Sequence, residues 1–260
     1  MTKQPDQAAR WRILLDALAH QRALSVAEAA ELLGVSEATV RRDFGELARR
    51  QLASRTHGGI VASSVAYDLP ARYRTTQDDP RERIAREAAS RVQSGSVVAF
   101  NGGTTTSAVA RALAARTDIR AADDDAVTVV TNALNIASDL VLRPSIRTVV
   151  LGGVARPQSY ELHGPFASRV LQDLLVDDLF LGVDAIGPEG VSCRHLGESM
   201  INAEMCAHAR RVTVVAAASK LGQVALARIC DLTRVHALIT DGDDEAVAPL
   251  REAGLEVTQV

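Results

Sequence analysis

The sequence predicts an α/β protein with an N-terminal winged helix-turn-helix domain, followed by a mostly parallel α/β domain. Three observations predict this arrangement. Two helix-forming stretches separated by a glycine turn lie within the first 50 residues. Short apolar runs alternate with helical stretches from about residue 81 to the end. The residues between these parts show no sustained periodicity. We therefore expect domains over residues 1–60 and 81–260, joined by a linker over residues 61–80.

The helices of the N-terminal domain are predicted from apolar spacing and capping residues. Ser25 and Glu28 form a Ser-x-x-Glu capping box for a second helix, which ends in a tight turn at Gly34. Ser36 can cap a third helix. The first helix is predicted by apolar residues that recur at i, i+3, i+4 and i+7: Trp11, Leu14, Leu15 and Leu18.

The third helix has the features of a DNA-reading helix. Val40, Phe44 and Leu47 point inward at helical spacing. A helix-turn-helix places such a second helix in the major groove, where arginine can bond guanine and threonine can meet a thymine methyl group. Paired arginines on a helix are more often only solvated surface. The outward face and its flanks carry the candidate DNA-binding residues: Ser36, Ala38, Thr39, Arg41, Arg42 and Arg49.

A small β-hairpin, or wing, is predicted after the third helix. Two β-prone runs flank Gly58 and Gly59, and Arg55 and His57 would lie beside a phosphate backbone. Residues 1–60 hold nine Arg and Lys against seven Asp and Glu, whereas the whole chain of 260 residues has a net charge of −3. A basic patch on one domain suffices for phosphate contact. The negative net charge of the whole chain therefore does not exclude DNA binding.

The cysteine pattern and the apolar runs predict a cytoplasmic protein. Cys193, Cys206 and Cys230 are widely spaced, without a Cys-x-x-Cys motif, and are interpreted as reduced core residues. No run reaches the length of a transmembrane helix, and no signal-peptide pattern begins the chain. We expect no metal and no cofactor, since the acidic run from Asp123 to Asp125 is most simply a solvated loop.

The C-terminal domain is predicted from alternating strands and helices, which imply a mostly parallel sheet covered by helices. A helix is expected to begin at Pro80. The predicted strands are short and apolar: Ser96–Phe100, Val127–Val130, Ile146–Leu151, Leu179–Val183, Val212–Ala216 and Ala237–Thr240. Three further helices are predicted between them: Ser107–Ala115, Leu134–Leu142 and Gly197–Arg210.

Polar residues and glycines follow several of these strands, where ligands bind in open α/β sheets. Glycines let a backbone approach a ligand, and hydroxyls with free N–H groups at a helix start form an anion site. The first strand runs into such a turn: Asn101, Gly102, Gly103, Thr104, Thr105 and Thr106. Further candidates follow other strands: Thr131, Asn132, Gly152, Gly153, Asp184 and Lys220. Lys220 is the sole lysine after Lys3.

Seven short motifs lie along nearly the whole chain. Two are in the N-terminal part, Thr39-Val-Arg-Arg-Asp-Phe and Arg55-Thr-His-Gly-Gly. The others are Gly102-Gly-Thr-Thr-Thr, Val130-Thr-Asn, Leu151-Gly-Gly, Phe180-Leu-Gly-Val-Asp and Ser219-Lys220. With these motifs the chain resembles the DeoR family of bacterial transcription regulators, whose N-terminal signature looks like the first two.

The resemblance implies that the second domain has a sugar-phosphate isomerase and CoA-transferase-like fold. It implies a repressor of carbohydrate-metabolism genes, which binds operator DNA and senses a phosphorylated sugar or related metabolite. Residues 102–106 would hold the phosphate and Lys220 would face the same site. We also expect a homo-oligomer, a dimer or tetramer, because one short helix reads too few base pairs and dimeric readers pair two half-sites.

Two departures from the family pattern keep a second interpretation open. Relatives commonly carry Asp at the position of Asn101, and Asp-Ser-Ser-Lys where this chain has Ala217-Ala218-Ser219-Lys220. The alternative is a sugar-phosphate isomerase with an appended DNA-binding domain. Isomerisation needs a positioned acid and base, for which Asp184, Glu204 and His195 are the candidates. The two absent carboxylates favour sensing over catalysis.

Overall fold

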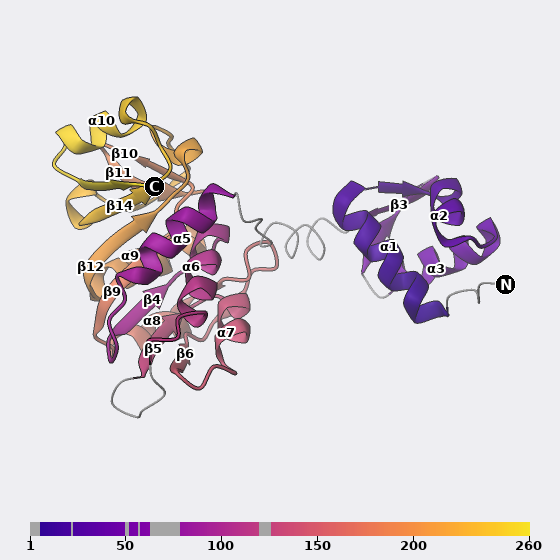
Figure 1. Cartoon of the computed structure of the whole chain (residues 1–260), viewed down its shortest axis with the longest axis horizontal. Coiled ribbons are helices and arrows are strands. Elements are labelled where there is room, and N and C mark those ends of the chain that lie inside the picture. The colour runs from indigo at the N-terminus through magenta and orange to yellow at the C-terminus, as the bar shows by residue number, and fades with distance from the viewer. Residues whose placement is uncertain (1–5, 22, 50–51, 57, 63–78, 120–125) are drawn as a thin grey trace. The chain divides into compact units, whose positions relative to one another are not determined.

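The computed structural model describes residues 6–21, 23–49, 52–56, 58–62, 79–119 and 126–260. The chain divides into two compact units, residues 1–74 and 75–260. The predicted linker lies mostly outside the described residues. Both units are shown in Figure 1, and each is described by itself.

The N-terminal unit is a winged helix-turn-helix, as the sequence predicts. The capping box forms, with the Ser25 side chain accepting from the Glu28 amide and Glu28 accepting from the Ser25 amide. Gly34 ends the second helix with φ of 64°, a left-handed conformation that glycine adopts without strain. Its helices are α1 (Gln7–Gln21), α2 (Val26–Leu33) and α3 (Glu37–Arg49). Its strands are β1 (Ala23–Ser25), β2 (Ala53–Arg55) and β3 (Gly59–Ala62), antiparallel in the order β1-β3-β2.

The wing lies tightly against the first strand at Gly59. A Cβ atom at this position would lie 2.2 Å from the carbonyl oxygen of Leu24. Only glycine therefore permits β3 to pair with β1 in this register. The helices bury the apolar face that the spacing predicts: Leu14, Leu18, Val40, Phe44 and Leu47 are each at most 1% exposed.

A buried ion pair joins α1 to α3. Asp43 is 1% exposed, and Arg10 donates to both of its carboxylate oxygens over 2.7 and 3.1 Å. The indole N–H of Trp11 donates to the same carboxylate over 3.1 Å. The hydrogen bond to Asp43 raises the pKa of Arg10 above its ordinary value. Asp43 therefore fixes α3 against α1, a role that the sequence analysis did not assign.

A seven-stranded parallel sheet forms the centre of the C-terminal unit, in the order β15-β14-β12-β9-β4-β5-β6. Successive side chains of a strand point to opposite faces, so Val98 and Phe100 join one core and Ala99 the other. Its strands are β4 (Val97–Phe100), β5 (Val127–Thr131), β6 (Ile146–Val150), β9 (Val176–Leu181), β12 (Ala209–Val215), β14 (Ala237–Thr240) and β15 (Glu256–Gln259).

Helices cover both faces of this sheet (Figure 1). One core is shared with α5 (Pro80–Ser90), α6 (Thr104–Ala114) and α7 (Leu134–Leu140). The other is shared with α8 (Pro165–Leu171), α9 (Leu196–His208) and α10 (Asp244–Glu252). The helix predicted at Pro80 begins there, with Asp79 accepting from the Arg81 amide as its cap.

The six predicted strands and the three predicted helices between them are all present, with small shifts at their ends. Elements α6, β9 and β12 each begin three residues before their predicted start. Strand β9 begins at Val176 although Asp177 and Asp178 interrupt its apolar pattern. The Asp177 carboxylate accepts from the Val97 amide over 2.9 Å, so this acidic residue ties neighbouring strands together.

Several short elements were not predicted. They include a pair of two-residue strands, β7 (Val154–Ala155) and β8 (Leu162–His163). A small antiparallel sheet also forms from β10 (Ala185–Gly187), β11 (Gly190–Cys193) and β13 (Ala227–Cys230). Strands of two to four residues give too short a pattern for period-two alternation to reveal. Helices α8 and α10, edge strand β15 and the 3-10 turns η1 (Ala218–Lys220) and η2 (Leu232–Arg234) were also missed.

We expect Asp43→Ala to destabilise the N-terminal unit by about 2–3 kcal/mol, because it leaves the Arg10 guanidinium and the Trp11 indole without their shared acceptor. Trp11 is the single tryptophan of the chain. Its fluorescence during denaturant unfolding of the full chain therefore reports on this unit.

The matched control is Glu37→Ala, which removes a carboxylate from the exposed Arg41–Glu37 pair on the same helix. Exposed ion pairs contribute little to stability. The free energy of unfolding of the control should therefore lie within about 0.5 kcal/mol of the wild-type value. Equal denaturation midpoints for Asp43→Ala and Glu37→Ala would contradict the role of Asp43 in fixing α3 against α1.

Candidate DNA-reading helix and effector site

The outward face of α3 presents the predicted arginines to solvent. Arg41 pairs with Glu37 over 2.8 Å, and Arg49 pairs with Glu46 over 2.6 Å. Arg42 is exposed and has no ion pair or side-chain hydrogen bond within the described part of the chain. Its guanidinium is thus available for a nucleic-acid acceptor without first breaking an internal interaction.

The other predicted DNA-binding residues lie at the start of α3 and on the wing. The Ser36 and Thr39 hydroxyls are 3.0 Å apart, Ala38 is exposed beside them, and Arg55 is exposed on β2. Ser36 also accepts from the Thr39 amide at 3.4 Å. His57 lies outside the described residues.

The turn from β4 into α6 has the form of an anion site. Gly103, with φ of 143°, caps α6, and within the described part of the chain no side chain caps the first N–H groups of that helix. Thr104 and Thr105 are half-buried in the first turn, whereas Thr106 is fully buried and donates to the Gly103 carbonyl over 3.1 Å. Backbone N–H groups and two threonine side chains thus remain at a helix N-terminus, where negative charge is stabilised.

Asn101 is held by the neighbouring strand end. Its amide nitrogen donates to the Gly182 carbonyl over 2.9 Å, and its amide oxygen accepts from the Gly182 N–H over 2.8 Å. At 1% exposure, it joins the ends of β4 and β9. Its side chain therefore has a structural role in this state, in addition to the effector contact expected from the sequence.

Thr131, the last residue of β5, and Asn132, which follows the strand, make different contacts. The Thr131 hydroxyl accepts from the Ala133 amide over 3.0 Å, which shapes the start of α7. Asn132 is fully buried and donates to Leu162 and to Glu161, each over 3.2 Å. The Asn132 amide oxygen is buried without a partner among the described residues.

The glycines after β6 approach β8 and α8. A Cβ atom at Gly153 would lie 2.6 Å from the His163 carbonyl oxygen, and one at Gly152 would lie 3.7 Å from Cβ of Phe166. Their small size thus lets the β7–β8 segment pack closely. No contact between these glycines and residues 102–106 is recorded within the described chain.

Glu161 is the main residue of the site that the sequence analysis missed. Its side chain lies directly on Gly102, where a Cβ atom would come within 2.2 Å of Glu161 Cγ. It follows Tyr160, whose φ of 61° is rare for a residue with a side chain and costs of order 1 kcal/mol. Burial, and then the nearby negative charge of Glu198, raise the pKa of Glu161 to about 8. A carboxyl group is therefore present and neutral near pH 7.

Three charged residues act on this carboxyl group: Glu198, Arg156 and Asp184. Glu198 on α9 accepts from Arg156 over 3.1 Å and from the Ser159 hydroxyl over 2.5 Å. Asp184, just after β9, lies 3.8 Å from Lys220 Nζ. We call Gly102, Asn132, Glu161, Asp184 and Lys220 the strand-end site.

The other residues considered for catalysis do not form an acid–base pair. His195 caps α9 by accepting from the Glu198 amide at 3.4 Å, and its ring lies 5.5 Å from that of His163. Glu204 accepts from the Ser168 hydroxyl over 2.8 Å, between α8 and α9. Positions 101 and 217 carry no carboxylate, as the sequence shows, but Glu161 brings a carboxyl group against Gly102 from a segment that was not predicted.

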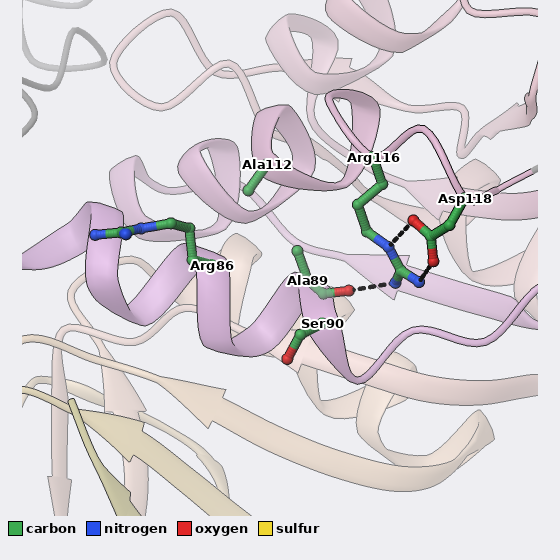
Figure 2. A pocket seen from close by; sticks show the side chains of 6 residues that line it. All are labelled: Arg86, Ala89, Ser90, Ala112, Arg116 and Asp118. Atoms are coloured by element: carbon green, nitrogen blue, oxygen red, sulfur yellow. Dashed lines mark hydrogen bonds and ion pairs between the residues drawn. The ribbon is translucent and has the colours of Figure 1, made fainter.

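A separate pocket lies between α5 and α6 (Figure 2). Arg116 at its wall donates to the Ala89 and Val92 carbonyls, each over 2.6 Å, and to Asp118 over 2.6 and 3.1 Å. Arg116 thus satisfies carbonyl groups at the end of α5. This arginine is engaged in helix capping, so we assign the pocket no ligand. The pocket is lined by Arg86, Ala89, Ser90, Ala112, Arg116 and Asp118.

No group of metal-binding side chains occurs among the described residues, from which Asp123 to Asp125 are excluded. Within the same residues, no helix has the length and apolarity that crossing a bilayer requires. The three cysteines are free thiols, with Sγ of Cys206 and Cys230 3.9 Å apart.

Comparison with known proteins agrees with this architecture. Residues 10–65 match the DeoR-like helix-turn-helix domain, and residues 76–242 match the DeoR C-terminal sensor domain. The chain belongs to the DeoR family of transcriptional regulators. It is 32% identical to a putative aga operon transcriptional repressor of Escherichia coli O157:H7, over 95% of this chain and 91% of that protein.

A second relative is the glycerol-3-phosphate regulon repressor of Escherichia coli K12, which is 30% identical over 90% of this chain and 91% of that protein. A solved ribose-5-phosphate isomerase structure aligns with 15% identity and a TM-score of 0.40, over 56% of this chain and 55% of that one. The family membership rests on the sequence matches, and the isomerase alignment adds no argument about activity.

We expect the stability of this regulator to depend on pH through Glu161. The folded state keeps this proton up to about pH 8, whereas the ordinary glutamate pKa is 4.5, so stability falls as pH rises across that window. Glu161→Gln carries no titrating group. Between pH 6 and pH 8, the free energy of unfolding of Glu161→Gln should rise by roughly 2 kcal/mol relative to that of the wild type.

Urea unfolding of the full chain, followed by circular dichroism, measures this difference. The control is Glu189→Gln, an exposed carboxyl in the turn between β10 and β11, whose curve should parallel that of the wild type. A constant offset between Glu161→Gln and the wild type at all pH values would show that Glu161 does not hold a proton on folding.

Proposed function

We propose that this DeoR-family regulator represses carbohydrate-metabolism genes and is controlled by a phosphorylated sugar or related metabolite. The observation that carries the proposal is the uncapped start of α6, at the carboxyl end of β4 beside the strand-end site. The two relatives, a putative repressor of an aga operon and a repressor of a glycerol-3-phosphate regulon, support the same class of effector.

DNA binding is proposed to use α3 and the wing. Arg42 is the residue expected to read a base, because it is exposed and free of internal ion pairs among the described residues. Arg41, Arg49 and Arg55 are exposed around it and would contact phosphates, which position the protein without specifying sequence. We place this activity in the cytoplasm.

The effector is proposed to bind with its phosphate at residues 102–106. N–H groups and the Thr104 and Thr105 hydroxyls supply donors, and Lys220 supplies positive charge. Lys220 is about one-third exposed and paired only loosely with Asp184 at 3.8 Å, so it can turn to a ligand at small cost.

We propose sensing without turnover, because the family is one of transcriptional regulators. Glu161 is a neutral carboxyl near the anion site, and the two carboxylates that act on it are engaged in ion pairs, Glu198 with Arg156 and Asp184 with Lys220. Incubation with ribose 5-phosphate and other sugar phosphates tests this, and conversion of any of them would favour an isomerase.

We further propose that the working form is at least a dimer that uses α8 and α9. Phe166 and Val170 lie one turn apart on α8, and Leu196 and Met200 one turn apart on α9. The Ser168–Glu204 hydrogen bond joins these helices, and Phe166 is 72% exposed. Sedimentation of the full chain tests this, and a monomer at micromolar concentration would contradict it.

For DNA recognition, we expect Arg42→Ala to cost about 1–3 kcal/mol at the selected operator and to relax preference at one base position. Arg55→Ala should weaken binding to all DNA sequences alike. It should also lower the salt dependence of the binding constant by about one released ion. Fluorescence anisotropy with an operator selected from random DNA measures both.

The control for recognition is Arg12→Ala, an exposed arginine on α1 outside the proposed surface. If Arg42→Ala binds and discriminates like Arg12→Ala, then Arg42 does not read a base.

For effector binding, Lys220→Ala and Thr105→Val should each remove the response to sugar phosphate while leaving operator affinity unchanged. They remove, respectively, the ammonium charge and a hydroxyl at the start of α6. Thermal shift identifies the active sugar phosphate, and operator release in anisotropy measures the response.

Thr233→Val is the matched control, because it removes an exposed hydroxyl in η2. Normal responses in both Lys220→Ala and Thr105→Val would place the effector elsewhere.

A further inference from the structure

We propose that Glu161 binds the effector directly as a neutral carboxylic acid, donating its proton to an effector oxygen beside Gly102, so that binding is linked to protonation. This rests on the proposed function, since it assumes that the anion lies at the start of α6. It adds a binding residue and a pH response that neither the family match nor the relatives' names assign.

The first support is the position of the Glu161 side chain. It touches Gly102, the residue directly before the helix cap Gly103. One carboxyl oxygen, Oε2, accepts from Asn132, whereas Oε1 lies 2.6 Å from the Cβ position of Gly102 and has no hydrogen bond within the described chain. Oε1 can donate a hydrogen bond when it carries the proton and can otherwise accept one. It thus lies against the backbone of the anion site without a hydrogen-bond partner among the described residues.

The second support is an orphaned acceptor next to it. The amide oxygen of Asn132 is buried and unpartnered among the described residues. Buried polar atoms without partners are rare and call for an explanation such as an absent ligand. A ligand hydroxyl would satisfy this acceptor, while N–H groups of α6 and a protonated Glu161 would satisfy anionic oxygens. The two orphans therefore fit a hydroxylated phosphate ester.

Charge decides which form of Glu161 is compatible with an anion. The charged groups that act on Glu161 are two carboxylates, Glu198 and Asp184, and one cation, Arg156. A second cation, Lys220, lies 3.8 Å from Asp184. Each cation already pairs with one of these carboxylates. A charged Glu161 would add a third negative group against an incoming anion without a cation of its own.

The remaining titratable groups near this region are His163, His195 and Cys193. The two rings contact each other, and burial raises the pKa of Cys193 to about 11. Burial and the charge of Glu198 keep Glu161 protonated up to about pH 8. A bound dianion adds negative charge and raises that pKa further, so binding near pH 8 takes up a proton.

Sulfate is the probe for this proposal, because its charge is constant from pH 6 to pH 9. Isothermal titration of the full chain should show sulfate affinity falling about tenfold from pH 7 to pH 9 in the wild type. Glu161→Gln places a neutral N–H donor at the same position, so its affinity should remain flat over that range. Titrations of the wild type at pH 8 in two buffers of different ionisation enthalpy should show uptake of about half a proton.

The outcomes separate this proposal from the one on which it rests. Parallel pH profiles for the wild type and Glu161→Gln would overturn the role of Glu161 and leave the anion site standing. Absence of proton uptake by the wild type would overturn it even if the glutamine variant misfolds. Failure of sulfate to bind either protein at any pH would overturn both the role of Glu161 and the proposed anion site.

Discussion

The parallel direction of the seven central strands is the constraint on which the rest of the C-terminal unit depends. Parallel strands end at the same edge, so residues far apart in sequence meet there. Asn101 reaches Gly182 across 81 residues, and Lys220 reaches Asp184. Helices on both faces bury the apolar side chains of the sheet, and polar groups gather where its strands end. The proposed sensing chemistry follows from that geometry.

Local signals were sufficient for most of the fold. Capping residues and apolar spacing predicted all three N-terminal helices, because Ser25, Glu28 and Gly34 act through neighbours within a few residues. Buried strands such as β5 and β14 were predicted because both faces are apolar. The short antiparallel strands β10, β11 and β13 depend instead on partners across the chain, which a window of a few residues does not contain.

The effector site stays a prediction, and the sequence did not indicate every residue that the structure places beside it. Motifs after the strands gave residues 101–106 and Lys220, but Glu161 follows no strand of the central sheet and comes from a segment that folds back over Gly102. Asp43 was missed for a related reason. A charged residue on a helix is expected at the surface, and only the tertiary partners Arg10 and Trp11 make its burial favourable.

The contact between Gly102 and Glu161 has a consequence for how this protein can evolve. The two positions share one volume, since a Cβ atom at residue 102 would lie 2.2 Å from Cγ and 2.8 Å from Cδ of Glu161. A larger residue at 102 is then tolerated only with a smaller one at 161, so the two are expected to covary among homologues. A paired substitution of this kind would replace the carboxyl group at the anion site and would thereby change the effector preference.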